Sequence, residues 1–158
     1  MASFHFNTRS ATSPAQQAVA TTFKTQVEML SAGSGRGQLF ELNVGPDGVP
    51  NVTDCSIVYD VSRATATCTG VAAIINPMNP ADGASRTTGK INATAEGTVT
   101  ANSMVWSVIL NQRASQRWIA APGFELAWPN TNANGLVSRA LSTNFTNSAG
   151  VAVYFTDL

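Results

Sequence analysis

Short apolar segments separated by turn residues make up most of the second half of the chain. Residues 124–128 and 151–155 alternate large apolar side chains with small or polar ones. A period of two residues is typical of a half-buried β-strand, because successive side chains point to opposite faces. Pro122-Gly123 and Asn134-Gly135 are turn signals between such segments. We therefore predict strands over 117–120, 124–128, 136–141 and 151–155.

Two details of these strands follow from the same pattern. Phe124, Leu126 and Trp128 are expected to share one face of their strand, since they are two residues apart. An unpaired apolar strand at the end of a chain would be an adhesive edge. We therefore expect the 151–155 strand to be paired inside a sheet.

The first half of the chain carries similar apolar segments. They predict strands over 38–44, 71–75, 91–100 and 104–110, and the continuous apolar run 71–75 is expected to be central in its sheet. The segments 45–48 and 76–85 are rich in glycine, proline and asparagine, which indicates a turn and a long loop. Strands at such regular spacing favour a β-sandwich or a jelly roll.

One stretch near the N-terminus has the pattern of a helix. Ser13-Pro14 has the form of an N-cap followed by a first helical residue, and Gly33 is a natural stop. Apolar residues recur at three- and four-residue spacing in between, which places Val19, Phe23, Val27 and Leu30 on one helical face. The predicted fold is therefore mainly β, a β-sandwich or jelly-roll-like domain with one N-terminal helix over 14–31.

Residues 1–12 are polar except for Phe4 and Phe6 and can be interpreted in two ways. They could be an N-terminal arm that becomes ordered against a neighbouring molecule, ahead of a single β-rich domain over 13–158. In that case the two phenylalanines would be interface residues. Alternatively, the segment is a first edge strand whose phenylalanines pack inward.

Two cysteines flank what resembles a hairpin. A turn near 60–63 would set Cys55 opposite Cys68 on neighbouring strands, which makes the pair a candidate disulfide. A reducing cytoplasm favours two free, partly buried thiols instead.

The composition of the 158-residue chain limits its partners. It is 44% hydrophobic and 11% charged, with a formal net charge of zero. Ordinary soluble domains are about 25% charged, so a surface covered by neighbours or carried by uncharged polar residues is expected. Nucleic acid is not an expected partner, because phosphate binding needs clustered lysine and arginine. No membrane partner is expected either, and the N-terminus does not resemble a signal peptide, which favours assembly in a cytoplasm.

No catalytic motif or cofactor site stands out. The single histidine, His5, has no acidic partner nearby in sequence, and the carboxylates are dispersed. The glycine-rich segment 33–37 lacks the lysine of a phosphate-binding loop. We therefore expect a protein that is not an enzyme and has no metal or cofactor.

The run 113–123, followed by an Asn-Gly loop and a terminal alternating strand, resembles small β-rich virion proteins of tailed bacteriophages, including capsid cement and decoration proteins. The resemblance covers the C-terminal third of the chain. It implies a structural protein of a virion, assembled in the host cytoplasm, that stabilises the major capsid protein lattice and binds its own copies, often as a trimer.

Arg117 and Trp118 are the anchors expected on this surface, because arginine and tryptophan are enriched at binding hot spots. The alternative is that Trp118 is a core residue and Arg117 is solvated. Two other functions stay open, a carbohydrate- or receptor-binding β-sandwich module of a tail or surface structure, and a small hydrolase.

Overall fold

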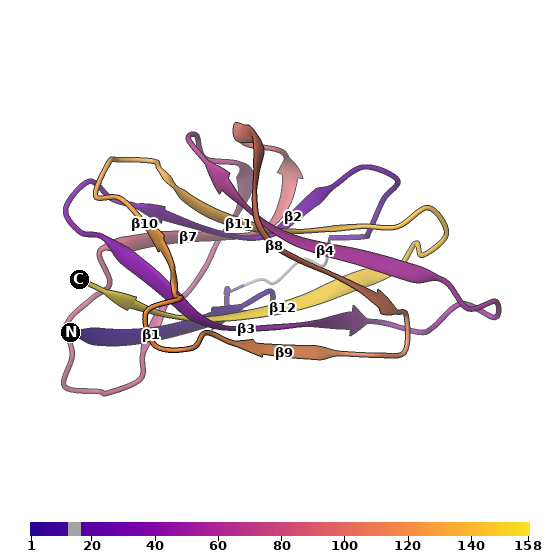
Figure 1. Cartoon of the computed structure of the whole chain (residues 1–158), viewed down its shortest axis with the longest axis horizontal. Helices are drawn as coiled ribbons and strands as arrows, with labels where there is room; N and C mark the ends of the chain where they lie inside the picture. Colours follow the sequence, from indigo (N-terminus) through magenta and orange to yellow (C-terminus); the bar gives the residue numbers. More distant parts are fainter. Residues whose placement is uncertain (13–16) are drawn as a thin grey trace.

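The computed structural model describes residues 1–12 and 17–158, which form two antiparallel β-sheets packed face to face (Figure 1). The first sheet has the strand order β10-β3-β12-β1-β6, and β9 also pairs with β3. Its strands are β1 (Ala2–Asn7), β3 (Gly37–Asp47), β6 (Asn76–Pro77), β9 (Gln116–Ile119), β10 (Leu126–Trp128) and β12 (Ser148–Asp157).

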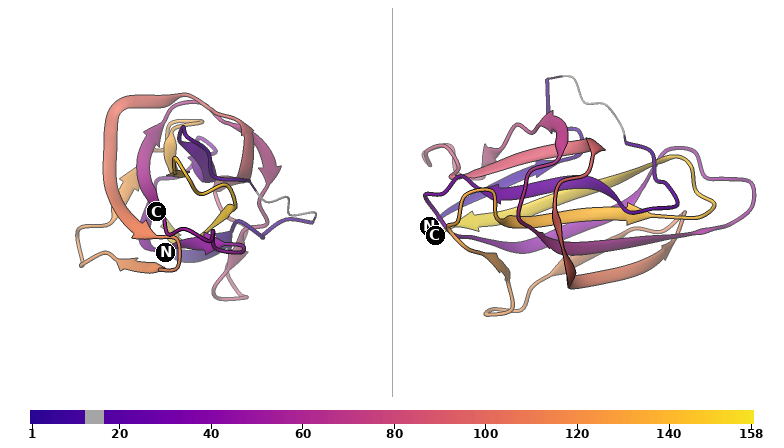
Figure 2. Two further views of the ribbon diagram at one scale, coloured as in Figure 1. Left: turned by 90° about the vertical axis from the view of Figure 1, so that its right-hand side faces the viewer. Right: turned by 90° about the horizontal axis from the view of Figure 1, so that it is seen from above.

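The second sheet has the order β5-β7-β2-β11-β4-β8. Its strands are β2 (Lys24–Ser31), β4 (Ser56–Ala64), β5 (Thr69–Ala72), β7 (Thr87–Ala95), β8 (Val99–Asn111) and β11 (Gly135–Leu141). Figure 2 shows, in the view along the strands, how the two sheets wrap around a common interior, and it places both termini at one end. The sandwich predicted from the alternating segments is confirmed.

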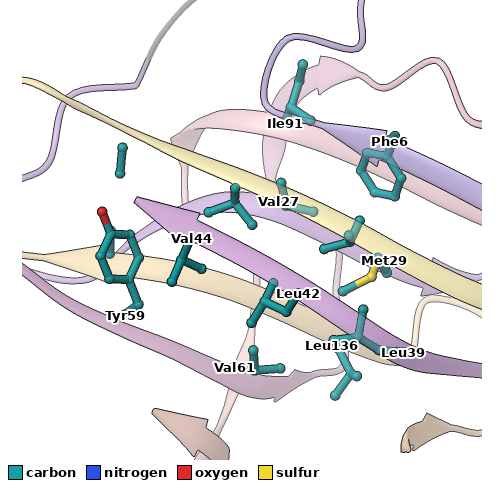
Figure 3. Packing of buried hydrophobic residues seen from close by; sticks show 14 of the residues in the cluster. Phe6, Val27, Met29, Leu39, Leu42, Val44, Tyr59, Val61, Ile91 and Leu136 are labelled. Atoms are coloured by element: carbon teal, nitrogen blue, oxygen red, sulfur yellow. The ribbon is translucent and has the colours of Figure 1, made fainter. Parts of the chain in front are cut away.

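The core is made by the inward-facing side chains of both sheets. Figure 3 shows Leu39, Leu42 and Val44 of β3 meeting Val27 and Met29 of β2. These residues are fully or almost fully buried, and Leu42 and Val44, like Val27 and Met29, lie two residues apart, as the pleat requires. Leu39 and Leu42 lie three residues apart, because the register of β3 with β12 shifts between them. Stacking two half-apolar sheets in this way removes one face of each from water, which is the main stabilising contribution to such a fold.

The terminal strand behaves as predicted. β12 lies between β3 and β1, and Val151, Val153 and Phe155 all point into the core. Pairing on both sides satisfies the backbone groups of this apolar segment and leaves no adhesive edge there.

The predicted helix over 14–31 is wrong. Residues 13–16 lie outside the described part of the chain, and 17–31 contain an extended segment followed by β2, with no helix. β2 is central in its sheet and buried on both faces, so its apolar residues do not follow a period of two. Val19 and Phe23 precede β2, Val27 faces the main core and Leu30 belongs to a second cluster, so the four residues share no single face.

Residues 1–12 contain a strand rather than a free arm. β1 pairs with β12 and β6, and Phe4 and Phe6 are buried in the core. Both rings contact Phe155, with ring centroids 5.6 Å and 6.1 Å away. The alternative of an inward-facing strand is therefore the one found, and neither phenylalanine is available to a partner.

The predicted placement of the cysteines is also wrong. Residues 60–63 lie inside β4 instead of forming a turn, because they pair with β11 on one side and β8 on the other. Asp60 also forms an ion pair with Arg139, its partner on β11. Cys55 precedes β4 and Cys68 precedes β5, and three strands separate β4 from β5 in the sheet. Both cysteines are buried free thiols. Burial, helped by the nearby Glu28 carboxylate, raises the pKa of Cys68 to about 12.

The segment 71–75 was expected to be a central strand and is instead part of an edge. β5 covers only Thr69–Ala72, pairs with β7 alone, and leaves Ile74 exposed beyond its end. An apolar run is therefore not sufficient to place a strand in the middle of a sheet, because the order of strands depends on distant pairings.

Two crossing connections explain why the outer face of β2 is buried. Residues 65–68 join β4 to β5 and residues 96–98 join β7 to β8, and both links span strands that are not neighbours. They cross closely at Gly97, where an added Cβ would lie 2.3 Å from the Ala66 carbonyl oxygen. Beneath them, Glu28 accepts hydrogen bonds from the Thr67 hydroxyl at 2.7 Å and the Cys68 N–H at 2.8 Å.

Candidate functional site

One exposed apolar segment beside the first sheet is the link between β9 and β10, here called the 119–124 loop. Phe124 has 75% of its surface exposed and Ile119 has 55%. The residues between them are Ala120, Ala121, Pro122 and Gly123, so the loop carries no charge. A phenylalanine on an uncharged surface loop is the kind of side chain that becomes buried when a partner binds.

Strand pairing causes this loop to project. β9 and β10 both run antiparallel to β3, with Ile119 opposite Glu41 and Leu126 opposite Leu39. The pairing positions on β3 are thus two residues apart, while the chain inserts six residues, 120–125, between their partners. The extra residues have no place in the sheet and must leave its edge (Figure 1).

The loop has a defined conformation. The Ala120 N–H donates to the Phe40 carbonyl oxygen at 2.9 Å, which ties the start of the loop to β3. At the tip, the Phe124 N–H donates to the Ala121 carbonyl oxygen at 2.9 Å, and Gly123 has a φ of 86°. Proline at the second position and glycine with positive φ at the third are the requirements of a type II turn. Phe124 is therefore presented by an ordered turn, which reduces the entropy lost on binding.

The two anchors predicted from sequence lie beside this loop, on β9. Arg117 is exposed and makes a two-pronged ion pair with Glu41, with both N···O distances 2.8 Å. This pairing lowers the pKa of Glu41 below its usual value. Trp118 is partly buried against the core, and its ring lies 6.3 Å from that of Trp106. Trp118 therefore packs inward from β9, the strand that leads into the loop.

Phe124 was missed at the sequence level. Its spacing from Leu126 and Trp128 predicted one shared strand face, but β10 begins only at Leu126. Trp128 is buried and Leu126 is partly buried, whereas Phe124 lies in the loop. The Pro122-Gly123 turn immediately before it was the available signal, since a turn residue so close to Phe124 shortens the strand.

A second surface feature is a shallow depression of about 390 Å³ on the outer face of the first sheet. Its floor includes Gly45 and Gly150, which are directly opposite each other on β3 and β12, and Ala152. Gly150 contributes no side chain to this surface, whereas Ser115 lies over Gly45, 3.0 Å from where a Cβ would be. Asn43, Ser115 and Gln116 contribute polar groups to the wall.

Two ion pairs stand at the depression. Arg9 donates from Nη2 to both oxygens of Asp47, at 2.8 Å and 3.0 Å, and the Arg117–Glu41 pair belongs to the same lining through Arg117. In such pairs, part of each guanidinium and carboxylate remains able to bond further groups. The depression therefore offers both donors and acceptors without a net charge.

The groups that could do chemistry are used structurally or kept apart. His5 stacks on Tyr154, with ring centroids 4.5 Å apart, and burial lowers the pKa of its imidazole although Glu41 opposes this. Asp60 is paired with Arg139, and Glu96 accepts from Thr25. Within residues 1–12 and 17–158, no group of three or more histidine, cysteine, aspartate or glutamate side chains could hold a metal ion. Across the same residues, no helix has the length and hydropathy needed to span a membrane.

The chain was compared with known proteins in three ways, and no family model, curated protein or solved structure matches it.

Proposed function

We propose that this protein is a non-enzymatic structural component of a virion, of the capsid cement or decoration type, and that it attaches to the major capsid protein lattice through the 119–124 loop. The observation that carries the proposal is the exposed, well-ordered Phe124 on an uncharged turn. The resemblance of the C-terminal third to small virion proteins of tailed bacteriophages supports the same conclusion, because the loop lies within that third.

The energetics of the loop suit this role. An exposed phenylalanine gains about 1.5–3 kcal/mol when it is fully buried. The rest of the 119–124 loop adds apolar contacts, and the nearest charge in sequence is the partly buried Glu125 that follows Phe124. Many copies bound to a regular lattice act together, so modest affinity at each loop is sufficient for stable decoration.

We predict that Phe124→Ala weakens binding to capsids roughly 30-fold, because a central aromatic contact contributes about 2 kcal/mol when it is truncated. The measurement is cosedimentation of the purified chain with capsids built from the major capsid protein of its own virion. Val52→Ala is the matched control, since Val52 is fully exposed on the loop between β3 and β4, outside the proposed contact. It should bind as the wild type does.

Two results would contradict this assignment. If the wild-type chain does not cosediment with capsids at any concentration, the virion role is wrong. If it binds but Phe124→Ala and Val52→Ala bind equally well, the 119–124 loop is not the contact.

A second candidate function, carbohydrate binding, is favoured by the depression on the first sheet. Its mixture of amides, hydroxyls and paired charges resembles the donors and acceptors that hold a neutral sugar. The volume of about 390 Å³ is the space that the depression offers to such a ligand.

Filling the depression tests this candidate. An added Cβ at Gly150 would have its nearest contact at 3.5 Å, on the Asp47 side chain, so Gly150→Val should fold normally. We expect neutral oligosaccharides to shift the amide resonances of Asn43 and Ala152 in the wild type, and the shifts to be lost in the variant. An absence of shifts at millimolar sugar in the wild type would rule out this function.

A further inference from the structure

We propose that the free edge of β8 pairs antiparallel with β8 of a second copy, so that the second sheets of two molecules join across a two-fold axis. This inference rests on the proposed function, because it names a surface through which a virion protein binds its own copies. The proposal is based on a long, uncharged, apolar strand at one edge of its sheet. The other edge strands described in the molecule are protected against pairing.

β8 lies at an edge of the second sheet. It is the last strand in the order of the second sheet and pairs with β4 on one side only (Figure 1). A strand in this position presents unpaired N–H and C=O groups, which form a template for another strand. Natural proteins protect such edges with short strands, prolines, charges or bulges.

The other edges in this molecule show these protections. β5 has four residues, β6 has two and includes Pro77, and β10 has three and is followed by Pro129. β9 has four residues and carries the charged Arg117. In contrast, β8 has thirteen residues, and its sequence VTANSMVWSVILN contains neither a charge nor a proline. Among the described strands, β8 is therefore the edge that lacks both charge and proline and is long enough to bind a partner strand, although its N-terminal half carries register shifts.

The C-terminal half of β8 is the part that can pair with a partner strand. Its N-terminal half is irregular, with register shifts against β4 near Val61 and Ser62. From Trp106 to Asn111 the pairing is regular. The Gln112 N–H donates to the Cys55 carbonyl oxygen at 2.9 Å, which defines the phase of the ladder. Because hydrogen-bonded and non-bonded pairs alternate, the backbone groups of Ser107 and Ile109 point away from β4.

The lack of charge on β8 favours a second copy as its partner. Two-fold pairing brings a strand against itself, so any charge near the axis would meet its own copy. No residue of β8 is charged, and pairing Ser107 of one copy with Ile109 of the other uses the free groups of both. In this register Val108 faces Val108, and Ile109, which is 68% exposed, gains an apolar surface across the junction. The strand is therefore complementary to itself.

The test is sedimentation velocity over a range of concentrations. The wild type should dimerise, and Ile109→Lys should raise the dimer dissociation constant at least about 10-fold, since the lysine meets apolar surface and its own symmetry mate. Ser107→Pro should also raise the dimer dissociation constant, because it removes an N–H that bonds the partner copy. That N–H faces solvent in the monomer, so proline is tolerated there. Val52→Lys adds the same charge at a fully exposed position elsewhere and should leave the dimer unchanged.

Hydrogen exchange provides a second readout. In the wild-type dimer the amides of Ser107 and Ile109 should be protected, and in Ile109→Lys the Ser107 amide should exchange rapidly while that of Val108 stays protected by β4. A wild-type chain that is monomeric up to about 1 mM, or variants that dimerise as well as the wild type, would overturn the proposal.

These outcomes are separable from those of the capsid experiment. A dimer that fails to bind capsids removes the virion role and leaves the β8 contact standing. A monomer that binds capsids through Phe124 removes the β8 contact and leaves the virion role standing.

Discussion

Replacing Arg139 with methionine should lower the free energy of unfolding by about 3–5 kcal/mol, the usual cost of leaving a buried charge without its partner. Asp60 has no exposed surface, and Arg139 is its ion-pair partner, with Nε 3.0 Å from Oδ1 and Nη2 bonded to Oδ2. The Ser62 hydroxyl donates to the same carboxylate at 2.9 Å, and cannot supply the lost charge. The arginine also lies over the Phe23 ring, 4.5 Å from its centroid.

Urea denaturation of Arg139→Met and of two companions tests this expectation. Arg113→Met breaks the exposed pair with Asp54, whose charges are both solvated, and should change stability little. Asp60→Leu combined with Arg139→Met removes both buried charges and should recover part of the loss, because an apolar replacement of a buried pair is often neutral. If the single variant is as stable as the wild type, the ion pair does not stabilise the β4–β11 junction.

Trp128→Ala should destabilise the protein by about 3–5 kcal/mol, the range for removing a large aromatic side chain from a core. Trp128 is 1% exposed and packs on Phe155, with ring centroids 5.8 Å apart. The indole occupies space left by Gly37, where an added Cβ would lie 2.0 Å from the ring. The ring therefore fills the end of the core where β10 pairs with β3, and its removal would leave a cavity there.

Trp128→Phe is the informative companion. The Trp128 Nε1 is buried and has no hydrogen-bond partner among the described residues, so phenylalanine loses packing but also removes an unsatisfied donor. It should cost clearly less than alanine. Trp118→Ala, at a partly buried position, should also cost less than Trp128→Ala. Equal losses for all three variants in urea denaturation would show that Trp128 is not a packing residue of the core.

Strands with a clear local alternation of apolar and polar residues could be predicted from the sequence. The alternation of Val151, Val153 and Phe155 describes one inward face, and the structure has that face buried. The strand predicted at 38–44 lies within β3, and that at 104–110 lies within β8. The period of two is kept in β12 and over Trp106–Leu110 of β8, whereas in β3 it is interrupted at Phe40, where the register with β12 shifts.

Prediction failed where burial depended on distant segments. β2 is covered on both faces, by the core on one side and by the connections that cross at Gly97 on the other. That second cover comes from residues about 40 and 70 positions away, as the contacts of Glu28 with Cys68 and of Thr25 with Glu96 show. No local period records such a cover, which is why the local pattern of β2 predicts a helix.

The sequence by itself determined that the chain would form short strands stacked as a sandwich, because alternation and turn residues act over a few positions. It also determined a surface with few charges and a C-terminal strand that had to be paired. Only the tertiary structure decided that Phe4 and Phe6 are core residues, that Trp118 packs against the core and that Phe124 is exposed. Those outcomes depend on which strands become neighbours and where they end on β3, and pairing between distant segments is a property of the whole sheet.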